Sequence, residues 1–227
     1  MPGRPAAFLI AAATALVILG VSILPFLTPA YIHVEQVRSG ADRETGYDQG
    51  TLDAVTGSIV HDLLLGGDFA TPVGGTPVLN EREQAHMRDV RGVFQGFFVL
   101  VASGVVVLAW AARRARAAEA RAATWRAVGS GARGLVVVLV IAGAFAVFAF
   151  DAAFEVFHRL FFPAGSYSFD PRTDRLVQLF PEQFWSETAI AVGVVSIALA
   201  LLIAWQAARR AASATPAAVL TTSRAGS

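Results

Sequence analysis

Two short polar motifs, each ending an otherwise apolar stretch, could carry acid–base chemistry in this chain. The first surrounds His86, with Glu83 and Asp89 about one helical turn away on either side. Imidazole titrates closest to neutrality of all side chains, and a carboxylate one turn away can fix its tautomer and raise its basicity. The first motif therefore predicts a histidine held by Glu83 or Asp89 that can exchange a proton near pH 7.

The second motif runs from Asp151 to His158. In a helix, Asp151, Glu155 and His158 fall within an arc of about 60°, so the three side chains share one face. Two carboxylates and an imidazole are costly near lipid unless they pair or face a wet cavity. This motif predicts a second histidine, oriented by Asp151 or Glu155.

Each motif alone also fits a plainer interpretation. The first could be an ordinary charged surface helix, and the second a helix end whose polar residues reach the headgroups. His33 and His61 have no comparable setting and are expected to be solvated or core histidines. The sequence contains no tight His-x-x-x-His pair, no cysteine, no Gly-x-Ser-x-Gly elbow and no phosphate-binding loop. These absences make the signal for a metal site weak, and they disfavour thiol, serine-hydrolase and nucleotide chemistry.

Four apolar blocks must position these motifs. A membrane-spanning helix needs roughly 20 residues, and the sequence predicts spans at about 6–27, 93–112, 134–157 and 188–208. The third span reaches that length only if its helix continues through the second motif. The first block is longer than the apolar region of a secretory signal, so we interpret it as an uncleaved span. The expected fold class is an all-α polytopic membrane protein of four transmembrane helices with a small, mainly helical extracytoplasmic domain.

Charge predicts the orientation of these spans. All 18 basic residues are arginine, and the termini and the 113–133 loop are arginine-rich. The positive-inside rule then places both termini, that loop and a disordered tail at 211–227 in the cytoplasm. Segments 28–92 and 158–187 become extracytoplasmic, and all four histidines and every acidic residue except Glu119 fall at or beyond the outer ends of the spans. The sequence predicts a plasma-membrane protein with its site at the outer face and without a nucleic-acid partner.

The two motifs are similar to a known family. The first resembles the signature of the bacterial lipoprotein intramolecular transacylases (Lit) in Asn80-Glu81-Arg82-Glu83, His86-Met87 and Asp89-Val90-Arg91. The second resembles the same family in Phe157-His158, Phe161-Phe162, Asp170-Pro171, Thr173-Asp174 and Pro181. The resemblance covers roughly residues 6–208. Arg91 departs from the usual lysine, Tyr167 stands where tryptophan is common, and the basic 113–133 loop is unusually long.

This resemblance implies an acyltransferase. Its substrate would be a diacylglyceryl-modified lipoprotein, whose sn-2 acyl chain moves from the glyceryl ester to the α-amine of the N-terminal cysteine. The product would be a lyso-form lipoprotein, and no cofactor is implied. His86 and His158 would be the catalytic residues. Orienting or substrate-binding roles are expected for Glu83, Asp89, Asp151, Glu155, Arg91, Asp170, Asp174 and Tyr167.

Two other functions fit the sequence. The first is a non-catalytic membrane module whose acidic face binds a partner protein or a cation, and it predicts that both histidines are replaceable. The second is a membrane metallohydrolase, which a chelator would inhibit.

Overall fold

The structure is a computed structural model that describes residues 3–214, except for the side chains of residues 146 and 147. Almost every described segment is helical. In chain order the elements are α1 (Arg4–Ile23), the 3-10 helix η1 (Leu24–Leu27), α2 (Pro29–Ser39), α3 (Ala41–Thr45), α4 (Gln49–Leu65), β1 (Pro72–Val73), β2 (Thr76–Pro77), α5 (Glu81–Arg114), α6 (Ala118–Phe148), α7 (Phe150–Phe161), α8 (Arg175–Leu179) and α9 (Glu182–Ser213). The two strands form a small antiparallel hairpin.

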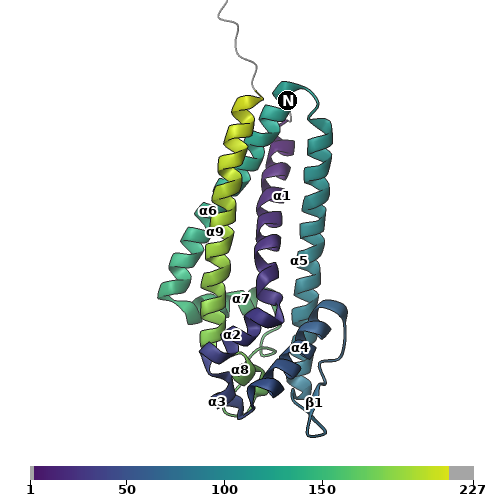
Figure 1. Ribbon diagram of the computed structural model, residues 1–227, viewed down its shortest axis with the longest axis vertical. Helices are drawn as coiled ribbons and strands as arrows, with labels where there is room; N and C mark the ends of the chain where they lie inside the picture. The colour runs from purple at the N-terminus through teal and green to yellow at the C-terminus, as the bar shows by residue number, and fades with distance from the viewer. Residues whose placement is uncertain (1–2, 215–227) are drawn as a thin grey trace, which may run out of the picture.

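Four of these helices are long and apolar enough to cross a membrane. Helix α1 lies in the middle of the bundle, between α5 on one side and the α6–α9 pair on the other (Figure 1). The short elements α2, α3, α4, α8 and the hairpin gather at one end of the bundle (Figure 1). This arrangement confirms the expected all-α polytopic fold with a small helical domain.

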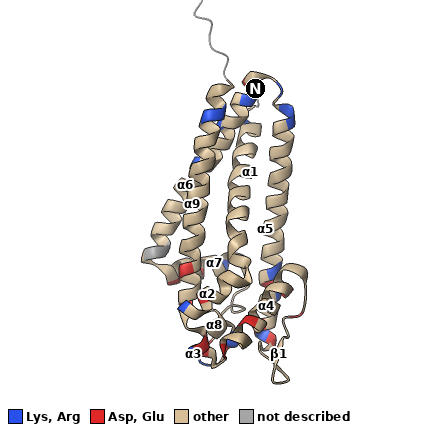
Figure 2. Ribbon diagram, in the orientation of Figure 1, with Lys and Arg blue, Asp and Glu red and all other residues tan. Residues whose placement is uncertain are grey.

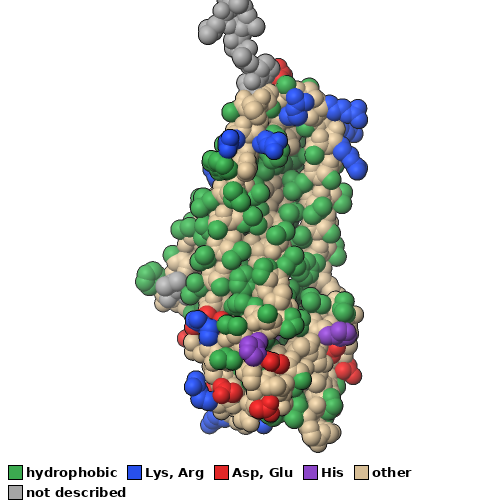
Figure 3. Space-filling model, viewed as in Figure 1, with side chains coloured by type: hydrophobic (Ala, Val, Ile, Leu, Met, Phe, Trp, Pro, Cys, Tyr) green, Lys and Arg blue, Asp and Glu red, His purple; other side chains and the backbone are tan. Residues whose placement is uncertain are grey.

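Small residues allow the long helices to approach closely. Gly131 of α6 lies directly against the backbone of Ala11 in α1, so a methyl group there would overlap it. Gly104 of α5 packs against Ala13 of α1 in the same way. In lipid, helices associate through such close packing because the hydrophobic effect gives no preference for a helix neighbour over an acyl chain. The outward surface of the bundle is a band of hydrophobic side chains (Figure 3).

The domain at the end of the bundle has its own hydrophobic core. Its most buried members come from α4, from the turns beside the hairpin, and from α8: they are Leu52, Val55, Phe69, Leu79 and Leu179. Gln36 of α2 is also fully buried, and its side-chain amide donates to the backbone oxygen of Leu179 at 2.9 Å. Segments far apart in the sequence, 28–92 and 158–187, are thus joined into one unit.

Charge divides the molecule along its long axis. Arginines cluster at the end where α5 meets α6 and where α9 finishes, whereas the acidic side chains other than Glu119 lie toward the end that carries the small domain (Figure 2). We call these the basic end and the acidic end.

Three expected boundaries are wrong. The helix of the third span does not continue to residue 157, because it breaks at Ala149, which has φ −149° and ψ 56°. The expected 113–133 loop is helical apart from a short link, since α5 runs to Arg114 and α6 starts at Ala118. Helix α9 extends to Ser213 through the first residues of the expected disordered tail, and residues 215–227 lie outside the described residues.

Candidate active site

His86 lies near the beginning of α5, and a capping box fixes where that helix starts. The Asn80 side chain accepts from the Glu83 backbone N–H at 3.0 Å, and the Glu83 carboxylate accepts from the Asn80 backbone N–H at 2.7 Å. The other oxygen of Glu83 accepts from the backbone N–H of Leu176 at 2.6 Å, in α8. Glu83 is 1% exposed, and this burial raises the pKa of its carboxyl above the usual value, although the backbone N–H groups of Leu176 and Asn80 act in the opposite direction. The beginning of α5 is therefore tied to a segment about 90 residues further along the chain.

His158 lies on α7, a separate helix that starts after the break at Ala149. Its Nδ1 lies 2.8 Å from the backbone oxygen of Phe154. A carbonyl oxygen only accepts, so Nδ1 carries the hydrogen and donates it to Phe154. The hydrogen bond fixes the tautomer of His158 and leaves Nε2 as an unprotonated acceptor.

The two predicted histidines lie together. The ring centroids of His86 and His158 are 6.2 Å apart, and their planes differ by 22°. Both side chains are buried, at 6% and 9% exposed. Among the described residues, His86 Nδ1 has no hydrogen-bond partner. This separation of the ring centroids places both imidazoles within reach of one substrate molecule.

An aromatic shell surrounds this histidine pair. The rings of Phe162 and Phe169 lie 4.9 Å and 5.4 Å from the His86 ring. The rings of Phe154, Phe162, Phe157 and Tyr167 lie between 4.0 Å and 5.5 Å from that of His158. Rings packed this closely on both imidazoles limit access of water and strengthen electrostatic interactions within the site.

The structure does not show the expected carboxylate partners on either imidazole. Glu83 serves the helix cap, and Asp89 makes no hydrogen bond to His86 among the described residues. Glu155 accepts from Arg159 Nε at 2.7 Å and from the Tyr167 hydroxyl at 3.3 Å. For Asp151, no hydrogen bond or ion pair is found in the part of the chain that is described. The backbone of Phe154, and not a side chain, orients His158.

Asp174 joins the two outer segments beside the site. It is 6% exposed and accepts from Asn80 Nδ2 at 3.1 Å, from an Arg82 NH group at 2.7 Å and from the backbone N–H of Asp170 at 2.8 Å. The Arg82 guanidinium also lies 4.9 Å from the centroid of the Phe169 ring, which packs on His86. Asp170 pairs with Arg172, whose side chain and backbone N–H hold the pKa of Asp170 below its usual range. Asp174 therefore supports the shell rather than touching the imidazoles.

The sequence also suggests Arg91 and Tyr167 as site residues. Tyr167 lies beside the imidazoles, whereas Arg91 binds the turn after α4. The Arg91 guanidinium donates to the backbone oxygens of Asp62 and Gly67, at 3.2 Å and 2.6 Å, and braces the turn that ends α4. Tyr167 belongs to the site, since its ring centroid is 5.1 Å from that of His158.

Sequence reasoning missed the roles of the phenylalanines and of the Phe154 carbonyl. Several aromatic residues of segment 157–185 pack on the imidazoles. The signal that could have located two of the phenylalanines is their position, since Phe154 and Phe162 each lie four residues from His158, which is about one helical turn.

The remaining histidines lie outside the site. His33 Nδ1 is 2.9 Å from the Asp53 carboxylate in an exposed pair, and the exposed His61 lies 3.3 Å from Asp62. Within residues 3–214, no three His, Asp or Glu side chains gather in a way that could hold a metal ion.

Comparison with known proteins gives the family. A family model described as "Lipoprotein intramolecular transacylase Lit" matches residues 8–185. The chain belongs to the Lit family. It is therefore a lipoprotein intramolecular transacylase by family, and hence an acyltransferase. No curated protein matches the chain.

Solved structures of a Lit protein have the same fold. The membrane-integral Lit of Bacillus cereus is 12% identical, and it aligns with a TM-score of 0.74 over 92% of this chain and 95% of that chain. Two forms of the same Bacillus cereus protein, each carrying a histidine substitution, align with TM-scores of 0.71 and 0.70 at 12% and 13% identity. Each alignment covers 92% of this chain, and 92% and 94% of the respective Lit chain. At this identity the likeness concerns the fold.

Proposed function

We propose that His86 and His158 together move an acyl chain within one lipoprotein molecule at the acidic end of the bundle. The acyl chain would leave the sn-2 glyceryl ester of a diacylglyceryl-modified lipoprotein and join the α-amine of its N-terminal cysteine. The product would be the lyso form of the lipoprotein. The observation that supports this most strongly is the burial of two imidazoles with centroids 6.2 Å apart, brought together from two distant helices. Both reacting groups belong to one substrate, so a site that only positions them and moves protons is sufficient.

His158 is assigned as the base. Its Nδ1 is committed to the Phe154 oxygen, so Nε2 is free to accept a proton. The neutral α-amine, with an ordinary pKa near 8, attacks the ester carbonyl carbon. His158 Nε2 then takes the proton that the new C–N bond makes acidic, and returns it to the sn-2 oxygen as the C–O bond breaks. Proton transfer of this kind contributes roughly 10²- to 10⁴-fold in rate.

His86 is assigned to the carbonyl oxygen. Its buried Nδ1 has no partner among the described residues, and a buried acceptor without a partner is tolerated better than a buried N–H. The neutral ring therefore carries its hydrogen on Nε2, which can donate to the oxygen as negative charge develops there. One such donor contributes roughly 10²- to 10³-fold. The aromatic shell would limit access of water, which would otherwise compete with the amine for the ester.

The proposed location is the outer face of the bacterial plasma membrane. The arginine-rich basic end would lie in the cytoplasm according to the positive-inside rule, which puts the acidic end and the histidine pair outside. The lipoprotein and the surrounding lipid are the proposed partners. The acyl chains of a lipid-anchored substrate would remain in the membrane while its ester reaches the headgroup level.

The test uses full-length protein in a membrane mimetic with a synthetic diacylglyceryl lipopeptide that has a free amine. Intramolecular transfer leaves the total mass unchanged, so tandem mass spectrometry must locate an acyl chain on the N-terminal nitrogen. We expect migration at the wild-type rate with His33→Ala, and migration slowed at least about 10²-fold with His86→Ala or His158→Ala. A chelator should have no effect. Migration near the wild-type rate after loss of either site histidine would contradict the proposal, and inhibition by the chelator would favour a metallohydrolase.

A further inference from the structure

The basic end contains a second site that the acyl-transfer chemistry does not use. A hollow of about 370 Å³ is lined there by Gln206, Arg209, Arg210 and Ser213 of α9. These residues are spaced i, i+3, i+4 and i+7, so they occupy one face of the helix. This face presents two cations, an amide and a hydroxyl around one opening. We propose that the hollow binds the phosphate headgroup of an anionic phospholipid.

The two guanidinium groups are held in place. Arg209 lies 4.8 Å from the ring centroid of Trp205, one turn earlier on α9, and Arg210 lies 6.0 Å from that of Trp125 on α6. A guanidinium stacked on an aromatic face keeps its N–H groups at its edge, where they remain available to oxygen atoms. The indole rings thus fix the cations and leave their donors free for a bidentate contact with a phosphate.

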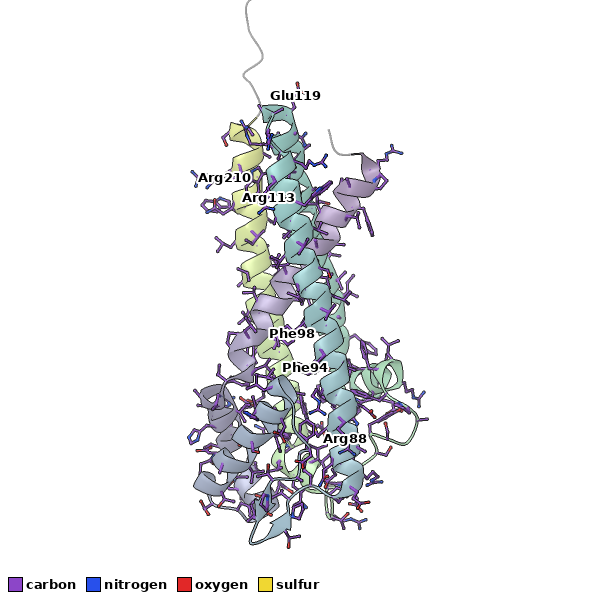
Figure 4. All side chains as sticks on the ribbon, turned by 90° about the vertical axis from the view of Figure 1, so that its right-hand side faces the viewer. Arg88, Phe94, Phe98, Arg113, Glu119 and Arg210 are labelled. Atoms are coloured by element: carbon purple, nitrogen blue, oxygen red, sulfur yellow. The ribbon has the colours of Figure 1, made fainter. Side chains whose placement is uncertain are left out.

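Among the described residues, no side-chain carboxylate pairs with these cations. Within residues 3–214, neither Arg209 nor Arg210 forms an ion pair, and the only acidic residue at the basic end is Glu119, at the beginning of α6 (Figure 4). The sequence after residue 214 contains no aspartate or glutamate. The carboxyl end of α9 carries about half a negative charge from its backbone dipole, which two full positive charges exceed. The hollow therefore attracts an anion.

The position of the hollow identifies the anion as a lipid. Trp205 and Trp125 mark the level at which aromatic residues of membrane proteins meet the headgroups. Below that level, α9 exposes the apolar residues Leu201 and Leu202, which suit acyl chains. A phosphodiester would then lie at the guanidinium level with its tails along α9. Basic pockets between membrane helices are known to hold anionic headgroups in this way.

The test is native mass spectrometry of full-length protein in nonionic detergent, titrated with phosphatidylglycerol or with phosphatidylcholine. We expect preferential binding of phosphatidylglycerol, and about tenfold weaker binding for Arg209→Gln combined with Arg210→Gln. The matched control is Arg113→Gln combined with Arg114→Gln. It removes the same charge at the same end, from α5, where Arg114 also stacks on a tryptophan, at 5.3 Å. This control should bind phosphatidylglycerol like the wild type.

A second variant tests the hollow without changing charge. Gln206→Leu combined with Ser213→Leu fills the opening on an exposed helix face and should also weaken binding by at least fivefold. Equal losses in both arginine pairs, or unchanged binding by the filled variant, would show diffuse charge attraction and overturn the proposed site. Equal binding of phosphatidylcholine would overturn it too. Complete displacement of the lipid by millimolar inorganic phosphate would show a free-phosphate site in place of a lipid site.

Discussion

At the scale of single residues, the backbone sets the chemistry of His158. The Phe154 carbonyl lies one turn before it on α7 and takes its Nδ1 hydrogen at 2.8 Å. Glu155, which the spacing of the motif also makes a candidate, is bonded to Arg159 and Tyr167. An orienting carboxylate is therefore not needed for the proposed base.

Neutral replacements of the two carboxylates on α7 test this assignment. We expect Asp151→Asn and Glu155→Gln to keep the transacylation rate within about threefold of the wild type, whereas His158→Ala should lose at least about 10²-fold. Glutamine at 155 can still accept from the Tyr167 hydroxyl, so the shell is preserved. The measurement is the initial rate of acyl migration in the lipopeptide. A loss with either carboxylate variant as large as that with His158→Ala would show that a carboxylate does orient the base.

The ionisation of Glu35 makes the free energy of unfolding depend on pH. It is 4% exposed, and burial first, with the neighbouring Glu187 carboxylate second, raises its pKa above the ordinary value of 4.5. Such a carboxyl costs no stability below its unfolded pKa and reduces stability as the pH rises through its folded pKa. Glu35→Gln should therefore unfold at a higher temperature than the wild type at pH 8, and this advantage should shrink toward pH 4.5. The exposed Glu44→Gln is the control and should change little at either pH. An advantage for Glu35→Gln that does not depend on pH would contradict this interpretation.

At this scale the sequence drew attention to two histidines that lie together in the structure, but it did not predict the hydrogen-bond partner of His158. His86 and His158 stand out because polar residues at the ends of apolar helices are costly without a function. A helical wheel places Glu155 near His158, but the rotamer decides whether the imidazole turns to a side chain or to the carbonyl of residue 154. That choice depends on packing against Phe162 and Tyr167, which arrive from outside the helix.

At the scale of elements, the beginning of α5 shows how local signals and tertiary contacts combine. Asn80 and Glu83 have the spacing of a capping box, and the structure contains that capping box at the first turn of α5. The bond from the Leu176 backbone N–H to Glu83 could not be predicted, because it joins residues 93 positions apart. The same carboxylate therefore caps the helix of His86 and anchors the segment that carries the other half of the shell.

Removal of that carboxylate should affect both stability and activity. Glu83→Ala leaves the buried N–H of Leu176 without a partner and removes the capping-box bond to the Asn80 N–H, so we expect a loss of roughly 2–4 kcal/mol in the free energy of unfolding. It should also slow acyl migration, since α5 and α8 lose their link. The control is Glu81→Ala, an exposed acid in the same helical turn, which should cost less than about 1 kcal/mol. Equal losses for the two variants, measured by denaturant titration in detergent, would contradict the role given to Glu83.

The break before α7 was not predictable from local sequence. Phe148, Ala149 and Phe150 include no proline or glycine, so nothing in the chain marks the end of a helix. A continued span would carry Asp151, Glu155 and Arg159 into lipid, at a cost of several kcal/mol. As a separate helix, α7 crosses the acidic end of the bundle (Figure 1). Its charged side chains can then stay at the membrane interface, and His158 lies beside His86 of α5.

At the scale of the whole molecule, the separation of charge along the bundle predicts its orientation. The chain has no cysteine, so single introduced thiols give clean reporters. Thr76→Cys lies in the exposed hairpin at the acidic end, and Ala117→Cys lies in the exposed link at the basic end. In intact cells, a membrane-impermeant maleimide should label Thr76→Cys and leave Ala117→Cys unlabelled until the membrane is opened. The reverse pattern would place the histidine pair in the cytoplasm.

The four-helix layout was recoverable from sequence because four apolar blocks stand out, although the third reaches spanning length by starting at Ala118 and not by continuing to residue 157. The contact between His86 and His158 could not be predicted from sequence, since it depends on how α5, α7 and α8 pack at the acidic end.

The proposed function depends on the two imidazoles acting together, and a double-mutant cycle is the test of this. Acyl migration would be timed for the wild type, His86→Ala, His158→Ala and the double variant. If the two imidazoles act on one substrate as a unit, each single loss should cost at least about 10²-fold and the double variant should be little slower than the slower single variant. Losses that multiply in the double variant, or a single variant near the wild-type rate, would contradict shared chemistry at this site.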